Sequence, residues 1–366
     1  MQIAIHPLKD SELKPMFTDP AKLGFCKSFT DRMFTMLFSE TEGWHSPEIK
    51  KFGPLSFEPS TCVLHYSQEI FEGLKAFSTT KGEINLFRPE MNARRFNRSA
   101  TRLCMPNIPE SDFIESIETL INLEKRWIPK SRGAALYIRP FMIGIDNILG
   151  VRASSNYLYC VILSPVGSYY QEGFNPISLY VTTEYSRAAK GGLGEAKTGG
   201  NYAASLLAGR VAREKGCAQV LWLDPIQHRN IEEVGAMNIF FVFNNELLVT
   251  PKLNGSILAG VTRDSVLTLA KHLGLKTEER EISIDEVVDG ITAGTITESF
   301  GSGTAASVSP VGNLKYNDKD YEINNRLVGP IAQRLYDYLL GIQYGETDDP
   351  FHWIRKVKMQ EKAALA

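Results

Sequence analysis

The chain lacks the features that would place it in a membrane or outside the cell. None of its apolar runs is long enough to span a bilayer. The first fifteen residues, MQIAIHPLKDSELKP, contain no charged segment followed by an apolar one and are not rich in arginine. The five cysteines are scattered, and no two have the spacing of a metal site or a redox pair. We therefore expect a cytoplasmic protein with free thiols and no metal.

A strong excess of either charge is also missing. Forty basic and 42 acidic residues give a net charge of −2, which supplies no global reason to expect nucleic acid or an anionic membrane as a partner. What remains is the composition of an ordinary globular protein, with 43% hydrophobic and 22% charged residues. A length of 366 residues suits two domains with sizeable cores.

The pattern of apolar segments predicts a mixed α/β chain in two parts. Aromatic and β-branched residues predict strands at 61–67, 84–89, 134–141, 156–163, 177–183, 218–224, 238–243 and 246–250. Apolar residues at helical spacing predict helices at 110–127, 201–215, 262–274 and 325–341. Thr262 is the expected N-cap of the third helix, and Gly216 and Gly274 are expected C-terminal stops.

A segment rich in proline and glycine, 164–176, follows the strand expected at 156–163. It predicts an interdomain linker at 171–176. An N-terminal domain would then cover residues 1–170 and a C-terminal domain residues 177–366.

The glycine-rich segment GLGEAKTGGNY, residues 192–202, carries a lysine in its middle. In a phosphate-binding P-loop the lysine follows the glycines and precedes Ser or Thr, so this segment is not one. Lys197 is either a solvated surface lysine or a nucleophile that reacts with an aldehyde, beside small residues that admit a planar ligand. Lys190 competes for that role, and spacing does not choose between the two.

Three further segments each carry a weak signal. A glycine-containing turn runs into a helix start at 256–266, which forms either an anion site or an ordinary turn. Two glutamates precede an apolar strand at 230–242, and small and hydroxyl residues gather at 299–310. Together with Lys197, these segments describe a ligand with an aldehyde, a phosphate and a basic ring nitrogen, which is pyridoxal 5′-phosphate.

The sequence closely resembles the branched-chain amino-acid aminotransferases, which have PLP fold type IV. The resemblance covers nearly the whole chain. It is carried by YSQEIFEGLKAF (66–77), LFRPEMNARRFNRSATRL (86–103), LYIRPFMIG (136–144), GEAKTGGNYAASL (194–206), QVLWLD (219–224), EEVGAMNIFF (232–241), ILAGVTRDSV (257–266), FGSGTAASVSPVG (300–312) and GIQYG (341–345). It implies two α/β domains with the active site between them, in a homodimer.

The resemblance implies a role for each matching residue. Lys197 would hold the cofactor covalently and move the proton at the substrate Cα. Glu233 would pair with the pyridine nitrogen, and Tyr202 would bind the ring phenolate oxygen. The phosphate would be held by Arg95, the backbone N–H groups of Val261 and Thr262, and Thr304. Arg94 adjoins Arg95, and only the register of the motif favours Arg95.

Substrate contacts are implied in the same way. The α-carboxylate would meet the Tyr137 hydroxyl and the N–H groups of Thr304 and Ala305. Tyr66, Phe71 and Tyr137 would line the side-chain pocket. Arg139, on the same strand face as Tyr137, would meet the side-chain carboxylate of glutamate. The alternative is a structural arginine paired with a fixed acid.

The activity implied is transfer of the amino group from L-leucine, L-isoleucine or L-valine to 2-oxoglutarate by a ping-pong mechanism. Rival interpretations are another fold type IV enzyme, such as a D-amino-acid transaminase or an aminodeoxychorismate lyase, and a non-catalytic protein that binds a phosphate ligand. The first two are disfavoured by the long match through LYIRPFMIG and FGSGTAASVSP. The third does not explain a lysine, a tyrosine and a carboxylate in one set.

Overall fold

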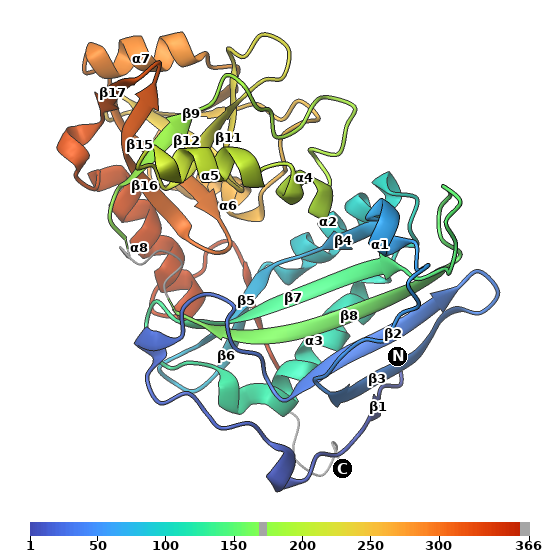
Figure 1. The fold of residues 1–366 in the computed structure, drawn as a ribbon. Helices are drawn as coiled ribbons and strands as arrows, with labels where there is room; N and C mark the ends of the chain where they lie inside the picture. The colour runs from blue at the N-terminus through green and yellow to red at the C-terminus, as the bar shows by residue number, and fades with distance from the viewer. Residues whose placement is uncertain (168–173, 359–366) are drawn as a thin grey trace. The chain divides into compact units, whose positions relative to one another are not determined.

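The computed structural model describes residues 1–167 and 174–358, which form two compact units, each with a nine-stranded sheet (Figure 1). The mixed α/β class expected from the sequence is confirmed. Among the described residues, the first unit takes in 1–167, 196–199 and 341–358, and the second takes in 174–195 and 200–340. Residues 341–358, which the sequence assigned to the C-terminal domain, therefore group with the first unit. Half of the linker expected at 171–176, residues 171–173, lies outside the described residues.

The sheet of the first unit has the strand order β1-β3-β2-β8-β7-β5-β6-β18, with β4 paired to β7. Its strands are β1 (Ala4–Ile5), β2 (Arg32–Ser39), β3 (Gly43–Lys51), β4 (Glu69–Phe71), β5 (Leu74–Ser78), β6 (Ile84–Phe87), β7 (Ala135–Gly144), β8 (Asn156–Val166) and β18 (Ile354–Lys356). Its helices are α1 (Val63–Tyr66), α2 (Pro89–Arg102) and α3 (Glu110–Glu124), with 3₁₀ turns η1 (Asp10–Glu12), η2 (Pro20–Lys22) and η3 (Lys125–Trp127).

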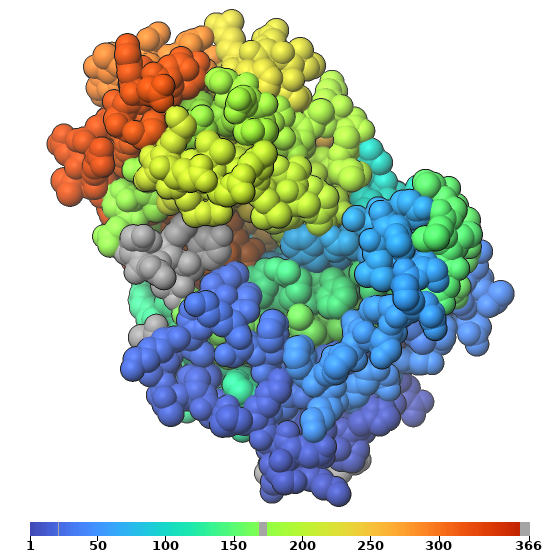
Figure 2. All heavy atoms as spheres, in the orientation of Figure 1, coloured from blue at the N-terminus to red at the C-terminus, as the bar shows by residue number. Residues whose placement is uncertain are grey.

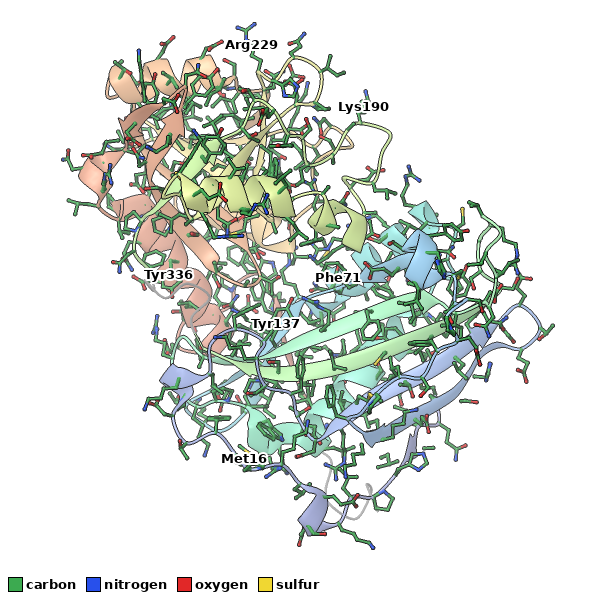
Figure 3. All side chains as sticks on the ribbon, in the orientation of Figure 1. Met16, Phe71, Tyr137, Lys190, Arg229 and Tyr336 are labelled. Atoms are coloured by element: carbon green, nitrogen blue, oxygen red, sulfur yellow. The ribbon has the colours of Figure 1, made fainter. Side chains whose placement is uncertain are left out.

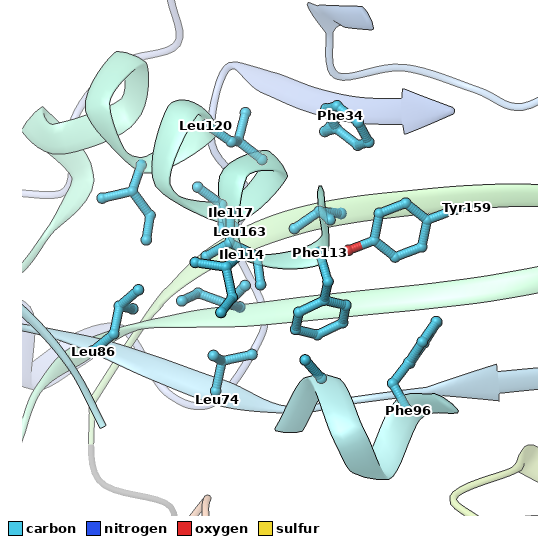
Figure 4. Packing of buried hydrophobic residues seen from close by; sticks show 14 of the residues in the cluster. Phe34, Leu74, Leu86, Phe96, Phe113, Ile114, Ile117, Leu120, Tyr159 and Leu163 are labelled. Carbon is cyan, nitrogen blue, oxygen red and sulfur yellow. The ribbon is translucent and has the colours of Figure 1, made fainter. Parts of the chain in front are cut away.

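The core of this unit lies between α2, α3 and one face of the sheet (Figure 4). Phe113, Ile117 and Leu120 recur at helical spacing along α3, and all three are buried. Tyr159 of β8 makes ring contacts with Phe96 of α2 and with Phe113, so aromatic side chains join both helices to the sheet. Burial of these apolar side chains stabilises the first unit, which contains α2 and β4.

The sheet of the second unit has the order β11-β10-β9-β16-β15-β12-β13-β14, with β17 paired to β16. Its strands are β9 (Ile177–Val181), β10 (Gln219–Leu223), β11 (Ile231–Val234), β12 (Met237–Phe243), β13 (Leu247–Pro251), β14 (Lys276–Arg280), β15 (Ile296–Gly303), β16 (Ser307–Tyr316) and β17 (Lys319–Glu322). Its helices are α4 (Gly199–Ala203), α5 (Leu206–Glu214), α6 (Val261–His272), α7 (Ile284–Thr292) and most of α8 (Pro330–Tyr344), with the turn η4 (Asn324–Arg326).

Most predicted elements are confirmed, and four details are wrong. Residues 61–67 form no strand: Val63–Tyr66 is a helical turn closed by Ser67 in the left-handed region. Four consecutive residues, 64–67, are exposed, so no strand face could be buried. The helix expected at 201–215 is two helices, α4 and α5. The N-cap of α6 is Gly260, and Thr262 lies inside the first turn.

The last predicted helix starts later than expected. Pro330 opens α8, and Leu327, expected on its apolar stripe, is exposed outside it. The carboxylate of Glu298 accepts hydrogen bonds from the N–H groups of Ile331 (2.9 Å) and Ala332 (2.8 Å). A side chain distant in sequence thus caps the first turn, and local periodicity could not reveal it.

Within residues 1–167 and 174–358, no helix is long and apolar enough to cross a membrane. The same residues contain no group of three or more His, Cys, Asp or Glu that could hold a metal ion. The structure places all five cysteines as free thiols.

Asp224 organises the loop that follows β10. Its Oδ1 accepts hydrogen bonds from the N–H groups of Ile226 (3.1 Å) and Gln227 (2.7 Å), and its Oδ2 accepts from those of Arg229 (3.0 Å) and Asn230 (2.8 Å). Burial opposes ionisation, but the four bonds outweigh it and lower the pKa of Asp224 to about 2. The loop therefore depends on an ionised carboxylate.

We expect Asp224→Asn to lower the free energy of unfolding by about 1–2 kcal/mol at pH 7, after allowance for solvent screening of a partly exposed group. Because the folded pKa lies below the unfolded one, this contribution is present above about pH 4 and is lost as the pH falls towards 2. Urea unfolding of both proteins at pH 7 and pH 3 measures it. Asp289→Asn, an exposed acid of α7, is the control. Equal midpoints for the two variants at pH 7 would contradict the assignment.

Candidate functional site

Lys197 lies in the segment 196–199, which groups with the first unit. Its N–H donates to Ser99 Oγ of α2 (2.9 Å), and its carbonyl accepts from the Phe71 N–H of β4 (3.0 Å). The next residue, Thr198, donates through Oγ1 to the Glu69 carbonyl (2.7 Å). Elements far away in sequence therefore fix the backbone of Lys197 on both sides.

The two candidate lysines of the glycine-rich segment differ in their surroundings. Lys190 is exposed on a loop of the second unit (Figure 3). Lys197 is half-buried, and its Nζ lies 4.7 Å from the centroid of the Phe71 ring. A fixed, partly desolvated amine is the better nucleophile, so the surroundings favour Lys197.

Arg95 of α2 forms a buried ion pair with Glu72, the residue that follows β4. Arg95 Nε lies 2.6 Å from Glu72 Oε1, and its Nη2 donates to Oε2 (2.9 Å). Asn92 also donates to Oε2 (2.8 Å). Burial works against ionisation of Glu72, but the charges of Arg95 and Lys197 prevail and lower its pKa. This carboxylate therefore stays charged and holds the guanidinium in one orientation.

Arg94, the neighbour that competed with Arg95, has a different environment. It is exposed and pairs with Glu110, with 3.2 Å between Nε and Oε2. Of the two arginines, Arg95 is the buried one, and it pairs with Glu72, whose charge also interacts with that of Lys197. The register of the motif and the burial of the side chain thus favour the same arginine.

Phe71, Tyr137 and Arg139 form one cluster, in which Arg139 contacts both rings. Arg139 Nη2 donates to the Tyr137 hydroxyl (3.0 Å), and the guanidinium carbon lies 4.6 Å from the centroid of the Phe71 ring. The Phe71 ring therefore has the cations of both Arg139 and Lys197 near it. The Phe25 ring contacts Tyr137 edge-on at 5.2 Å. Three of the four side chains predicted to meet substrate in this unit are brought together.

Tyr66, the fourth, is an exposed residue. It ends α1, is 40% exposed, and its hydroxyl donates to the Leu149 carbonyl. The structure thus places Tyr66 on the surface of this unit.

In the second unit, Glu233 of β11 is buried and held at both oxygens. Oε1 accepts from Asn238 Nδ2 (3.1 Å) and from the Leu258 N–H (3.3 Å), and Oε2 lies 2.6 Å from Arg187 Nε. Arg187 also donates through Nη2 to the Gly194 carbonyl (3.2 Å) and to that of Ser256. A buried carboxylate with these partners is prepared to stabilise a positive charge on a ligand.

The N-terminus of α6 lies beside this carboxylate. Gly260 caps the helix, and Val261 and Thr262 begin it, so their N–H groups have no intrahelical acceptor. A Cβ added at Gly260 would overlap Asn238 Oδ1, the amide that binds Glu233. Glycine here allows the start of a twelve-residue helix to approach Glu233, and the positive end of its dipole favours an anion.

The remaining predicted residues lie in the same unit. Tyr202 is a half-buried residue of the short helix α4, and Thr304 and Ala305 form the turn between β15 and β16. Ser302, at the end of β15, pairs in register with Asn238, which in turn pairs with Glu233. Cross-strand partners share a face, so Ser302 lies on the face of Glu233. Its Oγ is buried and has no hydrogen-bond partner among the described residues.

These surroundings fit the cofactor expected from the sequence. Lys197 supplies a fixed amine, Glu233 supplies a buried anion for a protonated ring nitrogen, and the start of α6 supplies N–H donors for a phosphate. The buried Ser302 hydroxyl is a further donor on the same face as Glu233. Arg95 is held in place by Glu72, which uses two of its five N–H groups.

Four residues of these arrangements were missed by sequence reasoning: Glu72, Arg187, Asn238 and Ser302. All four lie within or next to segments that were singled out, but nothing in a linear pattern marks a buried ion pair or a cross-strand amide. Only their pairing in three dimensions identifies them.

Comparison with known proteins supports the family and the cofactor that the sequence led us to expect. The family model described as amino-transferase class IV matches residues 69–314. The chain is 51% identical to branched-chain-amino-acid aminotransferase 2 of Bacillus subtilis (strain 168), with 93% of each chain covered. It is 47% identical to a probable branched-chain-amino-acid aminotransferase of Streptomyces coelicolor, with 95% and 96% covered. The crystal structure of an Escherichia coli branched-chain amino acid aminotransferase matches with a TM-score of 0.74 and 26% identity, and covers 89% of this chain and 99% of that one.

The packing around Tyr137 leads to a test. Gly73 lies between Glu72 and β5, and a Cβ at this position would overlap the Tyr137 hydroxyl and lie 2.9 Å from Cζ. We expect Gly73→Ala to destabilise the protein by about 1–3 kcal/mol, as overpacking does. Thermal or urea unfolding measures this loss.

The double variant Gly73→Ala/Tyr137→Phe lacks the clashing oxygen, so it should be more stable than Gly73→Ala alone. Gly53→Ala is the matched control, because the atom nearest to a Cβ there is 3.9 Å away. Equal stability of Gly73→Ala and Gly53→Ala would show that Tyr137 is not held against Gly73.

Proposed function

Because the chain belongs to the class IV aminotransferases, we propose that it transfers the amino group of L-leucine, L-isoleucine or L-valine to 2-oxoglutarate with pyridoxal 5′-phosphate as its cofactor. Relatives that are about half identical over more than 90% of the chain are named branched-chain-amino-acid aminotransferases. The observation that carries the proposal is the fixed Lys197 amine beside Phe71 and the Glu72–Arg95 pair. No feature of the structure favours the D-amino-acid transaminase, the lyase or the non-catalytic alternative.

The bound cofactor supplies an electron-withdrawing ring that stabilises negative charge at the substrate Cα. Lys197 Nζ then accepts the proton from Cα and returns it on the reverse path. Its backbone bonds to Ser99 and Phe71 keep the amine within reach of that proton. Fixed placement of this kind lowers the entropic cost of the proton transfer.

Glu233 has the electrostatic role in this proposal. Its carboxylate stabilises a proton on the ring nitrogen, and Arg187, Asn238 and the Leu258 N–H hold it in one orientation. Tyr202 binds the ring oxygen. Arg95, the Val261 and Thr262 N–H groups and Thr304 bind the phosphate.

Two unlike side chains must be accepted in turn, the alkyl group of leucine and the carboxylate of glutamate. Phe71 and Tyr137 offer apolar surface, and burial of an unpaired carboxylate against them is costly. Arg139 lies against both rings and donates to the Tyr137 hydroxyl. We assign it to the glutamate carboxylate. The substrate α-carboxylate is assigned to the Tyr137 hydroxyl and to the N–H groups of Thr304 and Ala305.

A homodimer is part of the proposal. Leu64 and Tyr66 of α1 and Leu149 and Val151 of the loop before β8 are exposed, by 40–84%. The Tyr66 hydroxyl donates to the Leu149 carbonyl, and the segments around residues 65 and 150 adjoin on the surface in Figure 2. An exposed apolar patch of this kind is typical of an interface, and it accounts for the position of Tyr66 on the surface. The five free cysteines suit the cytoplasm, which we retain as the expected location.

The role of Lys197 has a direct test. We expect Lys197→Ala to retain pyridoxal 5′-phosphate through the phosphate contacts and to lose transamination by at least about 10²–10⁴-fold, the usual contribution of a positioned acid–base group. Lys190→Ala, the neighbouring exposed lysine, is the control and should stay near wild type. Borohydride reduction followed by peptide mapping should place the adduct on Lys197. An adduct on Lys190, or near-normal turnover of Lys197→Ala, would refute the assignment.

The role of Arg139 requires the two half-reactions to be measured separately. Arg139→Ala should lose more catalytic efficiency with glutamate than with leucine, by on the order of 1.5–3 kcal/mol, as for a hydrogen bond to a charged group. Single-turnover rates for each amino acid give this difference. Arg132→Ala, an exposed arginine paired with Glu346, controls for loss of a surface charge. Equal losses with both substrates would mean that Arg139 only supports Tyr137 and Phe71.

A further inference from the structure

The second unit contains a cavity of about 260 Å³ that none of the proposed catalytic residues lines. It lies between the Asp224 loop, the start of β11 and the segment after β13. Its lining residues are Asp224, Ile226, Gln227, Asn230, Ile231, Glu232, Pro251, Lys252, Asn254, Ile257 and Glu281. A water molecule takes up about 30 Å³ in the liquid, so the volume suits a small organic molecule.

Glu232 is the most unusual residue of this lining. It is 3% exposed, and its Oε1 accepts hydrogen bonds from Asn254 Nδ2 (3.1 Å) and from Ser256 Oγ. Its Oε2 is buried and has no hydrogen-bond partner among the described residues. Burial raises the pKa of Glu232, which reflects the cost of the charge in this place. A buried carboxylate oxygen that lacks a donor is expensive, and a donor supplied by a ligand would remove that cost.

The other charged residues of the cavity indicate the charge of the ligand that it would bind. Both oxygens of Asp224 already accept two backbone N–H groups each. Lys252 is paired with Glu281, with 3.1 Å between Nζ and Oε1. Three acids and one base therefore leave a net negative lining, with Glu232 Oε2 as its open acceptor. This arrangement attracts a cation that donates hydrogen bonds and repels an anion.

The donor set suits an organic cation better than a metal ion. Calcium takes six to eight oxygen ligands, whereas the described residues contain no group of three or more His, Cys, Asp or Glu that could hold a metal. The walls beside Glu232 are apolar: Ile231 and Ile257 are buried, and Pro251 lines the same space. A primary ammonium group on a short alkyl chain matches both the acceptor and these walls.

We propose that this cavity binds a small aliphatic compound through its primary ammonium group, which donates to Glu232 Oε2. The alkyl chain lies against Ile231 and Ile257. Both a simple alkylamine and an aliphatic amino acid carry this group, and an amino acid would also bring its carboxylate towards Lys252.

A chain of contacts links the cavity to Glu233. Ser256 Oγ donates to Glu232, and the Ser256 carbonyl accepts from Arg187 Nη2. Arg187 in turn pairs with Glu233 through Nε (2.6 Å). Glu232 and Glu233 are successive residues of β11 and face opposite sides of the sheet. A ligand at Glu232 thus acts on the partner of the catalytic carboxylate without entering the catalytic site.

Isothermal titration calorimetry of isobutylamine into the holoenzyme, first reduced with borohydride so that the amine cannot exchange at Lys197, tests the proposal. Wild type should bind it, and Glu232→Gln should bind it about 10–100-fold more weakly, the equivalent of one hydrogen bond to a charged group. Asp289→Asn, an exposed acid outside the cavity, should bind it as wild type does. Binding that is unchanged in Glu232→Gln, or no binding to wild type, overturns the proposal.

A second variant and a second ligand distinguish the loss of a binding contact from a change in folding. Ile226 is 87% exposed at the cavity, so Ile226→Lys adds a positive charge there without touching the core and should weaken isobutylamine several-fold. Isobutyrate has the same shape with the opposite charge, and Glu232-dependent binding of isobutyrate stronger than that of isobutylamine contradicts an ammonium site. L-Valine distinguishes the two candidate ligands, an alkylamine and an aliphatic amino acid. Glu232-dependent binding of L-valine that is tighter than that of isobutylamine indicates an amino acid, and weaker binding indicates an amine.

Discussion

Each unit of this protein is organised around a buried glutamate that is paired with a buried arginine. Glu72 binds Arg95 in the first unit, and Glu233 binds Arg187 in the second. Removal of one partner from such a pair leaves an uncompensated charge in the interior, at a cost of about 3–5 kcal/mol. The pairs therefore fix two guanidinium groups and two carboxylates before any ligand binds. The functional proposal depends on that preorganisation, because a carboxylate that must stabilise a ring proton has to remain charged.

The backbone brings the other groups to these pairs through close approach at glycines. Gly73 lets Tyr137 pack directly against the turn after Glu72, and Gly260 lets the start of α6 reach Asn238 and Glu233. A side chain at Gly73 would displace Tyr137, and one at Gly260 would displace Asn238, which holds Glu233. Lys197 is held in a similar manner, because its backbone makes hydrogen bonds to α2 and β4.

Much of this could be predicted from the sequence, and the part that could not has a common physical cause. Strands rich in aromatic and β-branched residues and the stripe of α3 are local patterns, and they were found. Lys197, Arg95 and Glu233 could be proposed from the sequence because their motifs are linear. Glu72 and Arg187 act through partners that are distant in the chain, and the start of α8 is set by Glu298, 33 residues before Ile331. The turn at 61–67 was mistaken for a strand because composition does not reveal which side chains are exposed.

The central claim is that these pairs and Lys197 together move an amino group from a branched-chain amino acid to 2-oxoglutarate. Incubation of the purified holoenzyme with L-[¹⁵N]leucine and 2-oxoglutarate, followed by mass spectrometry of the products, measures this most directly. The account predicts ¹⁵N-labelled glutamate in amounts equal to the 2-oxo acid formed from leucine, and no such transfer from D-alanine. Failure to label glutamate from L-leucine, or labelling from D-alanine at a comparable rate, would contradict it.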